Sequence, residues 1–153
     1  MKTILATSQK GGSGKTTLVE TLSVEAERAG DGPAWVLDTD PQGTLSQWHE
    51  RREQDQPQRA EIAFDQIAAG LEKIEGRGAA YCFVDTAPTI SSQSAGLIKL
   101  ADRVLYAGAM TGGRSAPELA PRSAAAEEIA QLWANVKSCF HENSKPSRKV
   151  KYG

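Results

Sequence analysis

The stretch Lys10-Gly11-Gly12-Ser13-Gly14-Lys15-Thr16-Thr17 decides the fold of this chain. It follows the apolar run of residues 2–7, which predicts a short buried strand, and it precedes residues 18–29, which predict a helix. Glycines let the backbone turn so that its N–H groups face an anion, and a helix that begins there adds the positive end of its dipole. A strand, a glycine-rich loop and a helix in this order predict a phosphate-binding loop.

The polar side chains of this stretch fit a nucleotide triphosphate with its metal. Lys15 supplies a mobile positive charge for the β and γ phosphates, and Thr16 supplies a hydroxyl for Mg²⁺. The general phosphate-loop pattern has a glycine where this chain has Gln9. Together with Lys10, the stretch instead spells the variant K-G-G-x-G-K-[ST]. A flexible turn with two solvated lysines is the alternative interpretation.

Two further strands end in aspartates. Residues 35–37 lead into Asp38-Thr39-Asp40-Pro41-Gln42, and residues 81–84 lead into Asp85-Thr86-Ala87-Pro88. In open parallel sheets, ligands bind outside the carboxyl ends of the strands, so these carboxylates are expected near the phosphate loop. An aspartate at a strand end also has a purely local role, because it caps the following turn through backbone N–H groups.

These three motifs, in this order, resemble those of the ParA/MinD family of partition and positioning ATPases, which carry a deviant Walker phosphate loop. The string D-x-D-P-Q resembles the second family motif, and the strand that ends at Asp85 resembles the Walker B strand. The segment from Thr39 to Gln42, with Leu45-Ser46-Gln47-Trp48 after it, is similar to the small plasmid-partition members. The resemblance covers residues 1–107.

The resemblance implies ATP and Mg²⁺ as cofactors and assigns a role to each motif residue. The residues expected to bind the nucleotide are Lys10, Gly11, Gly12, Ser13, Gly14, Lys15, Thr16 and Thr17. The residues expected to hold the metal are Thr16, Asp38 and Asp85, with Asp38 beside the other two rather than on the ion. The residues expected to act in catalysis are Lys10, Lys15 and Asp40: Asp40 orients the attacking water, and Lys10 reaches the phosphates of a second copy. A solvated loop lysine is the alternative for Lys10.

The rest of the first 107 residues alternates between predicted helices and strands. Helices are expected at residues 44–53, 64–74 and 91–100, a polar connection at 54–59 and a strand at 103–107. Gly30 is expected to end the first helix. Such alternation predicts an α/β fold, a doubly wound and mostly parallel sheet with the P-loop NTPase topology.

The resemblance stops after residue 107. Residues 108–140 form a divergent segment rich in Ala and Gly, with one helix at 123–140 whose apolar stripe is expected to pack on the core. Residues 141–153 form a basic tail, expected to be disordered, which either is simply solvated or holds DNA phosphates. The C-terminal strands of a complete family domain are expected to be missing, as in a truncated or frame-shifted gene.

Composition describes a single domain outside the membrane. The 153 residues have 39% hydrophobic content, and 18 basic against 19 acidic residues give a net charge of −1. Mean hydropathy is −0.44 and no apolar run is long enough to span a bilayer, so a cytoplasmic location is expected. Cys82 and Cys139 are expected to be reduced thiols, and His49 and His141 to be surface residues.

Three functions remain open from the sequence. The first is a partition-type ATPase that dimerises with ATP, binds DNA without sequence preference and responds to a partner protein. The second is a truncated or degenerate relative that binds nucleotide without efficient hydrolysis. The third is a metabolic enzyme of the same superfamily, which the D-x-D-P-Q string and the lack of cluster cysteines disfavour.

Overall fold

The structure is a computed structural model that describes residues 1–8, 14–88, 92–106 and 124–142. Strands and helices alternate along these residues. In chain order they are β1 (Lys2–Thr7), α1 (Lys15–Arg28), β2 (Ala34–Asp38), α2 (Thr44–Glu50), β3 (Gln58–Ala60), the 3-10 helix η1 (Phe64–Gln66), α3 (Ile67–Gly76), β4 (Tyr81–Asp85), α4 (Ser92–Leu100), β5 (Arg103–Tyr106) and α6 (Ala124–Glu142). The predictions for residues 108–123 and for the tail from residue 143 lie outside the described residues.

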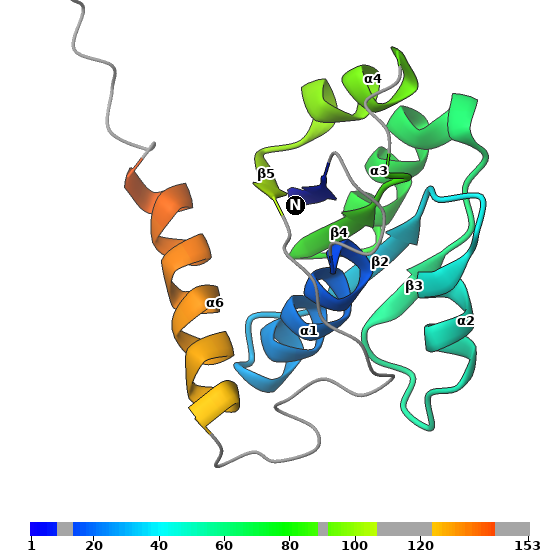
Figure 1. The fold of residues 1–153 in the computed structure, drawn as a ribbon. Coiled ribbons are helices and arrows are strands. Elements are labelled where there is room, and N and C mark those ends of the chain that lie inside the picture. The colour runs from blue at the N-terminus through cyan, green and yellow to red at the C-terminus, as the bar shows by residue number, and fades with distance from the viewer. Residues whose placement is uncertain (9–13, 89–91, 107–123, 143–153) are drawn as a thin grey trace, which may run out of the picture.

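The five strands form one sheet in the order β3-β2-β4-β1-β5 (Figure 1). Every pair of neighbours is parallel, and the strands next to β4 are β2 and β1, which are not consecutive in the chain. Parallel neighbours need crossover connections, and here helices supply them on both faces of the sheet. The predicted doubly wound α/β fold is therefore confirmed.

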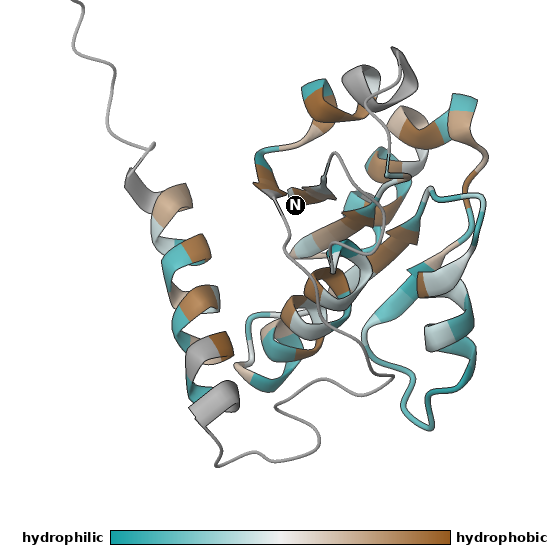
Figure 2. Cartoon of the chain, in the orientation of Figure 1, coloured by the Kyte–Doolittle hydropathy of each residue, from teal (hydrophilic) through white to brown (hydrophobic). Residues whose placement is uncertain are grey.

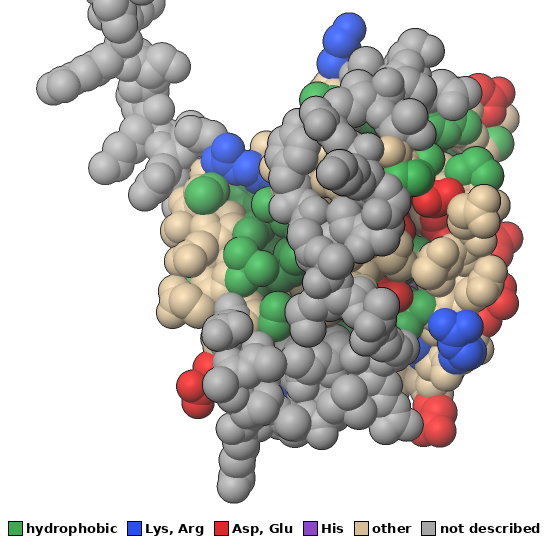
Figure 3. All heavy atoms as spheres, in the orientation of Figure 1, with side chains coloured by type: hydrophobic (Ala, Val, Ile, Leu, Met, Phe, Trp, Pro, Cys, Tyr) green, Lys and Arg blue, Asp and Glu red, His purple; other side chains and the backbone are tan. Residues whose placement is uncertain are grey.

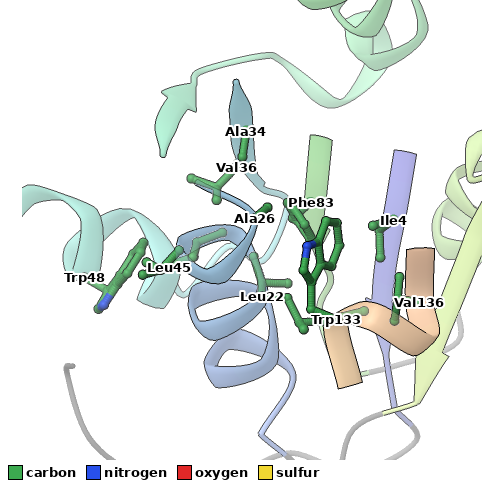
Figure 4. Packing of buried hydrophobic residues seen from close by; sticks show 13 residues of the cluster. Ile4, Leu22, Ala26, Ala34, Val36, Leu45, Trp48, Phe83, Trp133 and Val136 are labelled. Carbon is green, nitrogen blue, oxygen red and sulfur yellow. The ribbon is translucent and has the colours of Figure 1, made fainter. Parts of the chain in front are cut away.

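Each face of the sheet carries its own hydrophobic cluster. On one face, side chains of β1, β2 and β4 pack against α1, α2 and α6, and Figure 4 shows Trp133 of α6 directed toward Phe83 of β4. On the other face, alternate residues of the same strands pack against α3 and α4. Hydrophobic residues accordingly occupy the strands and the inner sides of the helices in Figure 2. Burial on both faces explains why the strands read as continuous apolar runs.

Helix α6 belongs to this core although it follows the undescribed residues 107–123. Trp133 is 1% exposed and Val136 is 6% exposed, and Leu132 and Phe140 pack against the same cluster. Hydrophobic side chains gather where α6 meets the body of the protein (Figure 3). The expectation that this apolar stripe packs on the core is therefore confirmed.

Most predicted elements are observed with small shifts at their ends, and three expectations are wrong. Residues 54–59 were expected to be a polar connection, but Gln58 and Arg59 belong to strand β3, which pairs with β2 from Gln58 to Ala60. Helix α1 begins at Lys15 rather than at Leu18. His49 is half-buried rather than on the surface, and its ring nitrogen Nε2 lies 2.8 Å from the carbonyl oxygen of Pro57.

The end of α1 follows the prediction for Gly30. Its backbone has a left-handed φ of 76°, and its N–H donates to the carbonyl of Glu27 while the N–H of Asp31 donates to that of Ala26. This pair of bonds is a Schellman motif, which glycine permits without steric cost. The chain then turns directly into β2.

Both cysteines are free thiols, as expected. Cys82 lies on β4 in the core, and burial raises the pKa of its thiol to about 12, whereas Cys139 is exposed. Among the described residues, no helix combines the length and the apolar character that crossing a bilayer requires.

Candidate functional site

Three neighbouring strands end together at one edge of the sheet. β4 ends at Asp85, which lies in register with Asp38 at the end of β2 on one side and with Ala6 of β1 on the other. The chain that leaves β1 returns to this edge as the start of α1. The first turn of α1 and the two aspartates therefore meet, as the position of ligand sites in open parallel sheets predicts.

The start of α1 combines a left-handed glycine with a helix end that lacks a side-chain cap among the described residues. Gly14 occupies the N-cap position with φ 82° and ψ 17°, a left-handed conformation that favours glycine. In the part of the chain that the structure describes, no side chain caps this helix end, and its first turn contains no acidic residue. Uncapped N–H groups at a helix N-terminus attract anions, so this end of α1 is suited to a phosphate group.

Lys15 brings a positive charge to the same place. Its side chain is only 6% exposed, and Nζ donates a hydrogen bond to Oγ of Ser8, just after β1, at 3.3 Å. A lysine is seldom buried unless it is paired. Within the described residues no carboxylate forms an ion pair with it, so Lys15 is positioned to pair with an anionic ligand.

Thr16 and Asp85 are joined directly. The Thr16 hydroxyl donates to Oδ2 of Asp85 at 2.5 Å, which connects the first turn of α1 to the end of β4. Asp85 is 1% exposed, and its other oxygen, Oδ1, is buried without a hydrogen-bond partner among the described residues. A buried carboxylate oxygen of this kind is costly unless a cation or a donor meets it.

The environment of Asp85 disfavours its charge. Burial raises the pKa of Asp85 to about 6, and the nearby carboxylates of Asp38 and Asp40 add to this rise. The hydrogen bond from Thr16 and the charge of Lys15 act in the opposite direction and are outweighed. A bound cation would offset these effects, because it favours the ionised carboxylate.

Asp38 and Asp40 both hold their own loop. The two oxygens of Asp38 accept hydrogen bonds from the N–H groups of Asp40 at 3.1 Å and Ser46 at 2.9 Å. Oδ1 of Asp40 accepts from the N–H of Gln42 at 2.9 Å. The local capping role, which the sequence left open for a strand-end aspartate, is thus present at both residues.

Two threonines at this edge were missed from the sequence. Thr39 donates from both its N–H, at 3.0 Å, and its hydroxyl, at 2.6 Å, to the carbonyl oxygen of Asp85. The Thr86 hydroxyl donates to the carbonyl of Ala6 at 2.9 Å. These bonds tie the ends of β2, β4 and β1 together. The available signal was the repeated Asp-Thr dipeptide at the ends of two strands.

A pocket of about 390 Å³ opens beside these loops, toward α3 and α4. Its lining includes the polar side chains of Asp38, Thr39, Asp40 and Thr86 together with apolar side chains such as Phe64, which is 40% exposed. The pocket has the size and the mixed polarity of a small-molecule site.

The structure brings together the predicted residues that it describes. Gly14 precedes α1, and Lys15, Thr16 and Thr17 form its first turn, while Asp38 and Asp85 end β2 and β4, and Asp40 lies in the turn after β2. Lys10, Gly11, Gly12 and Ser13 lie outside the described residues.

The donor set suits Mg²⁺ held jointly with a phosphate. No group of three or more His, Cys, Asp or Glu side chains in the described ranges could hold a metal by itself. Mg²⁺ usually keeps several waters and binds through one or two carboxylates together with substrate phosphates. The unpartnered oxygen of Asp85, with the Thr16 hydroxyl beside it, provides such a partial site.

Solved structures share this fold. The MinC:MinD cell division protein complex of Aquifex aeolicus matches with a TM-score of 0.52 and 19% identity over 69% of this chain and 55% of that one. A structure described as a plasmid partition protein of Borrelia burgdorferi B31 bound to AMPPNP matches with a TM-score of 0.50 and 15% identity, over 69% and 62%. A ParA family ATPase of Chlorobium tepidum TLS gives a TM-score of 0.57 and 13% identity, over 87% and 98%.

At these identities the likeness concerns the fold, and the chain spans about half the length of the chain that it matches in the Aquifex aeolicus complex. A comparison with curated proteins gives no match. The family described as the CobQ/CobB/MinD/ParA nucleotide binding domain matches residues 4–146, which extends past residue 107 and includes α6. The chain therefore belongs to the CobQ/CobB/MinD/ParA family of nucleotide-binding domains.

Proposed function

We propose that this chain binds ATP with Mg²⁺ and hydrolyses it, as a partition-type ATPase whose nucleotide state controls dimerisation. The observation that carries the proposal is the contact between Thr16 and Asp85, which joins the start of a glycine-initiated helix to a buried carboxylate. The family match adds nucleotide binding as the shared property. The AMPPNP bound to the Borrelia burgdorferi protein supports an adenine nucleotide as the ligand.

The triphosphate would lie across the N-terminus of α1. Backbone N–H groups from Gly14 onward face the phosphates, and Lys15 exchanges its bond with Ser8 for the β and γ phosphates. Thr17, in the first turn, is assigned to the α phosphate. By the resemblance, Gly11, Gly12 and Ser13 complete the loop with further N–H donors.

Thr16 and Asp85 would hold Mg²⁺, with Asp38 beside them. The metal supplies positive charge that neutralises the phosphate oxygens. Asp85 would hold the ion through its unpartnered oxygen or through a water, and a bound cation would favour its charged form. Asp38 keeps its two N–H bonds and so fixes the loop that carries Asp40.

Hydrolysis would follow by in-line attack of a water on the γ phosphorus. The water oxygen forms a bond to phosphorus, the bond from phosphorus to the β–γ bridging oxygen breaks, and ADP leaves with the electron pair. The proton of the water passes to the released phosphate. Asp40 orients the water. Lys15 of the same chain, together with Lys10 from a second copy, neutralises the charge that develops in the transition state.

The partners of this switch are proposed from the family. An ATP-dependent homodimer would bind DNA without sequence preference, and a partition protein would stimulate hydrolysis in the cytoplasm. The MinC:MinD complex supports a protein partner for this kind of domain. The chain spans 55% of the chain that it matches in that complex, so dimerisation and partner binding are tested directly below.

Titration calorimetry with ATP and Mg²⁺ tests the proposal. The wild-type chain should bind ATP, Lys15→Ala should abolish binding, and Lys99→Ala, an exposed lysine of α4, should bind as the wild type does. Equal ATP binding by the wild type and Lys15→Ala would contradict the site. Phosphate release with and without DNA, and gel filtration with ATP and with ADP, then separate an active switch from a domain that only holds nucleotide.

A further inference from the structure

We propose that a second pocket, at the β3 edge of the sheet, binds a small anion that carries an apolar group. The pocket has a volume of about 260 Å³ and lies between α3 and the segment formed by β3 and the loop after it. Neither Lys15 nor Asp85 lines it, and Ile62 is a shared wall between it and the larger pocket beside Asp40. The inference therefore does not depend on the proposed ATPase activity.

Small and apolar residues line part of this pocket. α3 contributes Ala69 and Gly70 to the lining, so its backbone lies close to the segment that carries Ile62. Gly70 packs directly under Ile62, since a Cβ atom built on it would lie 2.5 Å from Cδ1 of Ile62. The buried ring of Trp35, which is 7% exposed, forms part of the apolar lining. The interior of the pocket therefore suits an apolar group.

Two positive charges that have no acidic partner among the described residues line this pocket. Lys73 and Arg77 are exposed, line the pocket and form no ion pair within the part of the chain that the structure describes. The Arg77 guanidinium lies 5.7 Å from the centroid of the Trp35 ring, which holds it over the aromatic lining. The third cation, Arg59, is already paired with Glu61 and Glu50.

Helix stability alone does not favour placing Lys73 and Arg77 four residues apart at the end of α3. Like charges four residues apart on a helix repel each other by a few tenths of a kcal/mol. The C-terminal end of α3 favours cations, which lets both residues remain there. It does not account for a pocket whose lining combines both charges with apolar side chains such as Ile62 and Ile74. An anion at this position would be attracted by both cations.

Volume and polarity define the class of ligand. At roughly 30 Å³ for each water-sized group, 260 Å³ holds about nine such groups, which is smaller than a drug-sized site. The ligand would thus be a compact molecule, with an aromatic or short aliphatic body against Trp35 and a phosphate or carboxylate group between Lys73 and Arg77.

Phenyl phosphate serves as the probe, titrated into the ¹⁵N-labelled full chain and followed by two-dimensional NMR. The experiment uses the Lys15→Ala background, which removes phosphate binding at the start of α1. We expect saturable shifts of the Trp35 indole N–H and of the amides of Ala60 and Glu61. Replacing Lys73 and Arg77 by Gln should weaken binding by at least about tenfold, because both charge-assisted contacts are lost. Lys99→Gln should leave it unchanged.

Phenol, which lacks the anionic group, provides a control with the wild-type side chains of the pocket in place. It should bind at least about tenfold more weakly than phenyl phosphate. The proposal is overturned if Trp35 does not shift at about 10 mM phenyl phosphate, well above a millimolar dissociation constant. It is overturned equally if phenol binds as well, or if the Gln variant retains full affinity.

Discussion

The indole N–H of Trp133 donates a hydrogen bond of 2.7 Å to Oδ2 of Asp31, across 102 positions of sequence. Lys137 Nζ donates to the same oxygen at 2.5 Å. One carboxylate in the turn between α1 and β2 thus holds two side chains of α6. Burial alone would raise the pKa of Asp31, but the hydrogen bonds from Lys137 and Trp133 outweigh it and lower the pKa.

Asp31→Asn should loosen α6. The amide keeps the shape of the side chain but loses the negative charge, so the contacts with Lys137 and Trp133 weaken. We expect the free energy of unfolding to fall by about 1 to 2 kcal/mol at pH 7, measured by urea denaturation. Asp55→Asn, at an exposed loop residue, should change it by less than about 0.5 kcal/mol.

The same pair of variants gives a pH test. A carboxylate whose pKa is lower in the folded state adds stability above the pKa of the unfolded chain, near 3.9, and this stability is lost as the pH falls through the folded value. The loss of unfolding free energy caused by Asp31→Asn should therefore become smaller below about pH 4. A deficit that stays constant down to acid unfolding would mean that the charge of Asp31 is unimportant.

Asp85 should show the opposite dependence. Its pKa is raised to about 6, so the folded protein holds a proton there more tightly than the unfolded chain does. This contribution is complete below about pH 4 and is lost as the pH rises through about 6. Without Mg²⁺ and nucleotide, the free energy of unfolding of Asp85→Asn, relative to that of the wild type, should therefore increase by roughly 2 kcal/mol when the pH is raised from 4.5 to 8.

Urea denaturation in EDTA at several pH values measures this gain. The stability of Asp85→Asn relative to the wild type should rise with pH and then level off above about pH 7. A pH-independent difference would show that Asp85 titrates in the folded chain as it does in the unfolded chain. Addition of Mg²⁺ with ATP should narrow the gap, because the cation stabilises only the ionised carboxylate.

The sequence predicted what depends on local pattern. β1 is observed at residues 2–7 as expected, and Gly30 ends α1 in the left-handed conformation that its position indicated. Both features follow from burial or backbone freedom within a few residues of chain. The aspartates at the strand ends were also located correctly, since parallel strands present their carboxyl ends at one edge.

The features that were missed depend on the tertiary structure. Gln58, Arg59 and Ala60 have no strand pattern of their own, and they form β3 only because β2 offers an unpaired edge. The contact between Asp31 and Trp133 joins distant segments and has no local signature. The two N–H bonds to Asp38 show that a motif residue also supports its own loop, which spacing alone left open.

Two glycines of α3 provide a matched test of packing. Gly70→Ala places a methyl group 2.5 Å from Cδ1 and 2.8 Å from Cγ2 of Ile62, so Ile62 must move. We expect a net loss of about 1 kcal/mol despite the better helix propensity of alanine. Gly76→Ala meets no atom within 4 Å and should be neutral or stabilising by up to about 1 kcal/mol. Thermal denaturation compares the two, and equal effects would contradict the contact with Ile62.

Lys10 should affect assembly rather than affinity. Lys10→Ala is expected to keep ATP binding, because the phosphate contacts proposed for Lys15 and the start of α1 come from a single chain. It should lose the ATP-dependent dimer and reduce phosphate release to the background rate, since the proposed role of Lys10 is on the second copy. Calorimetry, gel filtration with ATP and a phosphate-release assay measure the three properties. If Lys10→Ala hydrolysed ATP at the wild-type rate, Lys10 would have no role in catalysis, as expected of a solvated loop lysine.

Thr39 should fix the position of Asp40 relative to Asp85 and so affect ATP turnover. Its hydroxyl and N–H both bond the carbonyl oxygen of Asp85, so the loop that carries Asp40 is fixed to the strand that carries the proposed metal ligand. Thr39→Val keeps the shape and the N–H bond but removes the hydroxyl bond. We expect a loss of about 1 kcal/mol of stability and a roughly tenfold fall in ATP turnover, with more Mg²⁺ needed for half-maximal rate.

Thr39→Ser separates this positioning role from a simple packing effect. Serine restores the hydroxyl and removes only a methyl group, so turnover and the Mg²⁺ requirement should return toward the wild type even if stability does not. Thr44→Val, at an exposed residue that opens α2, should leave both unchanged. If Thr39→Val and Thr39→Ser lower turnover equally, shape and not the hydroxyl bond to Asp85 holds the loop in place, because only serine can form that bond.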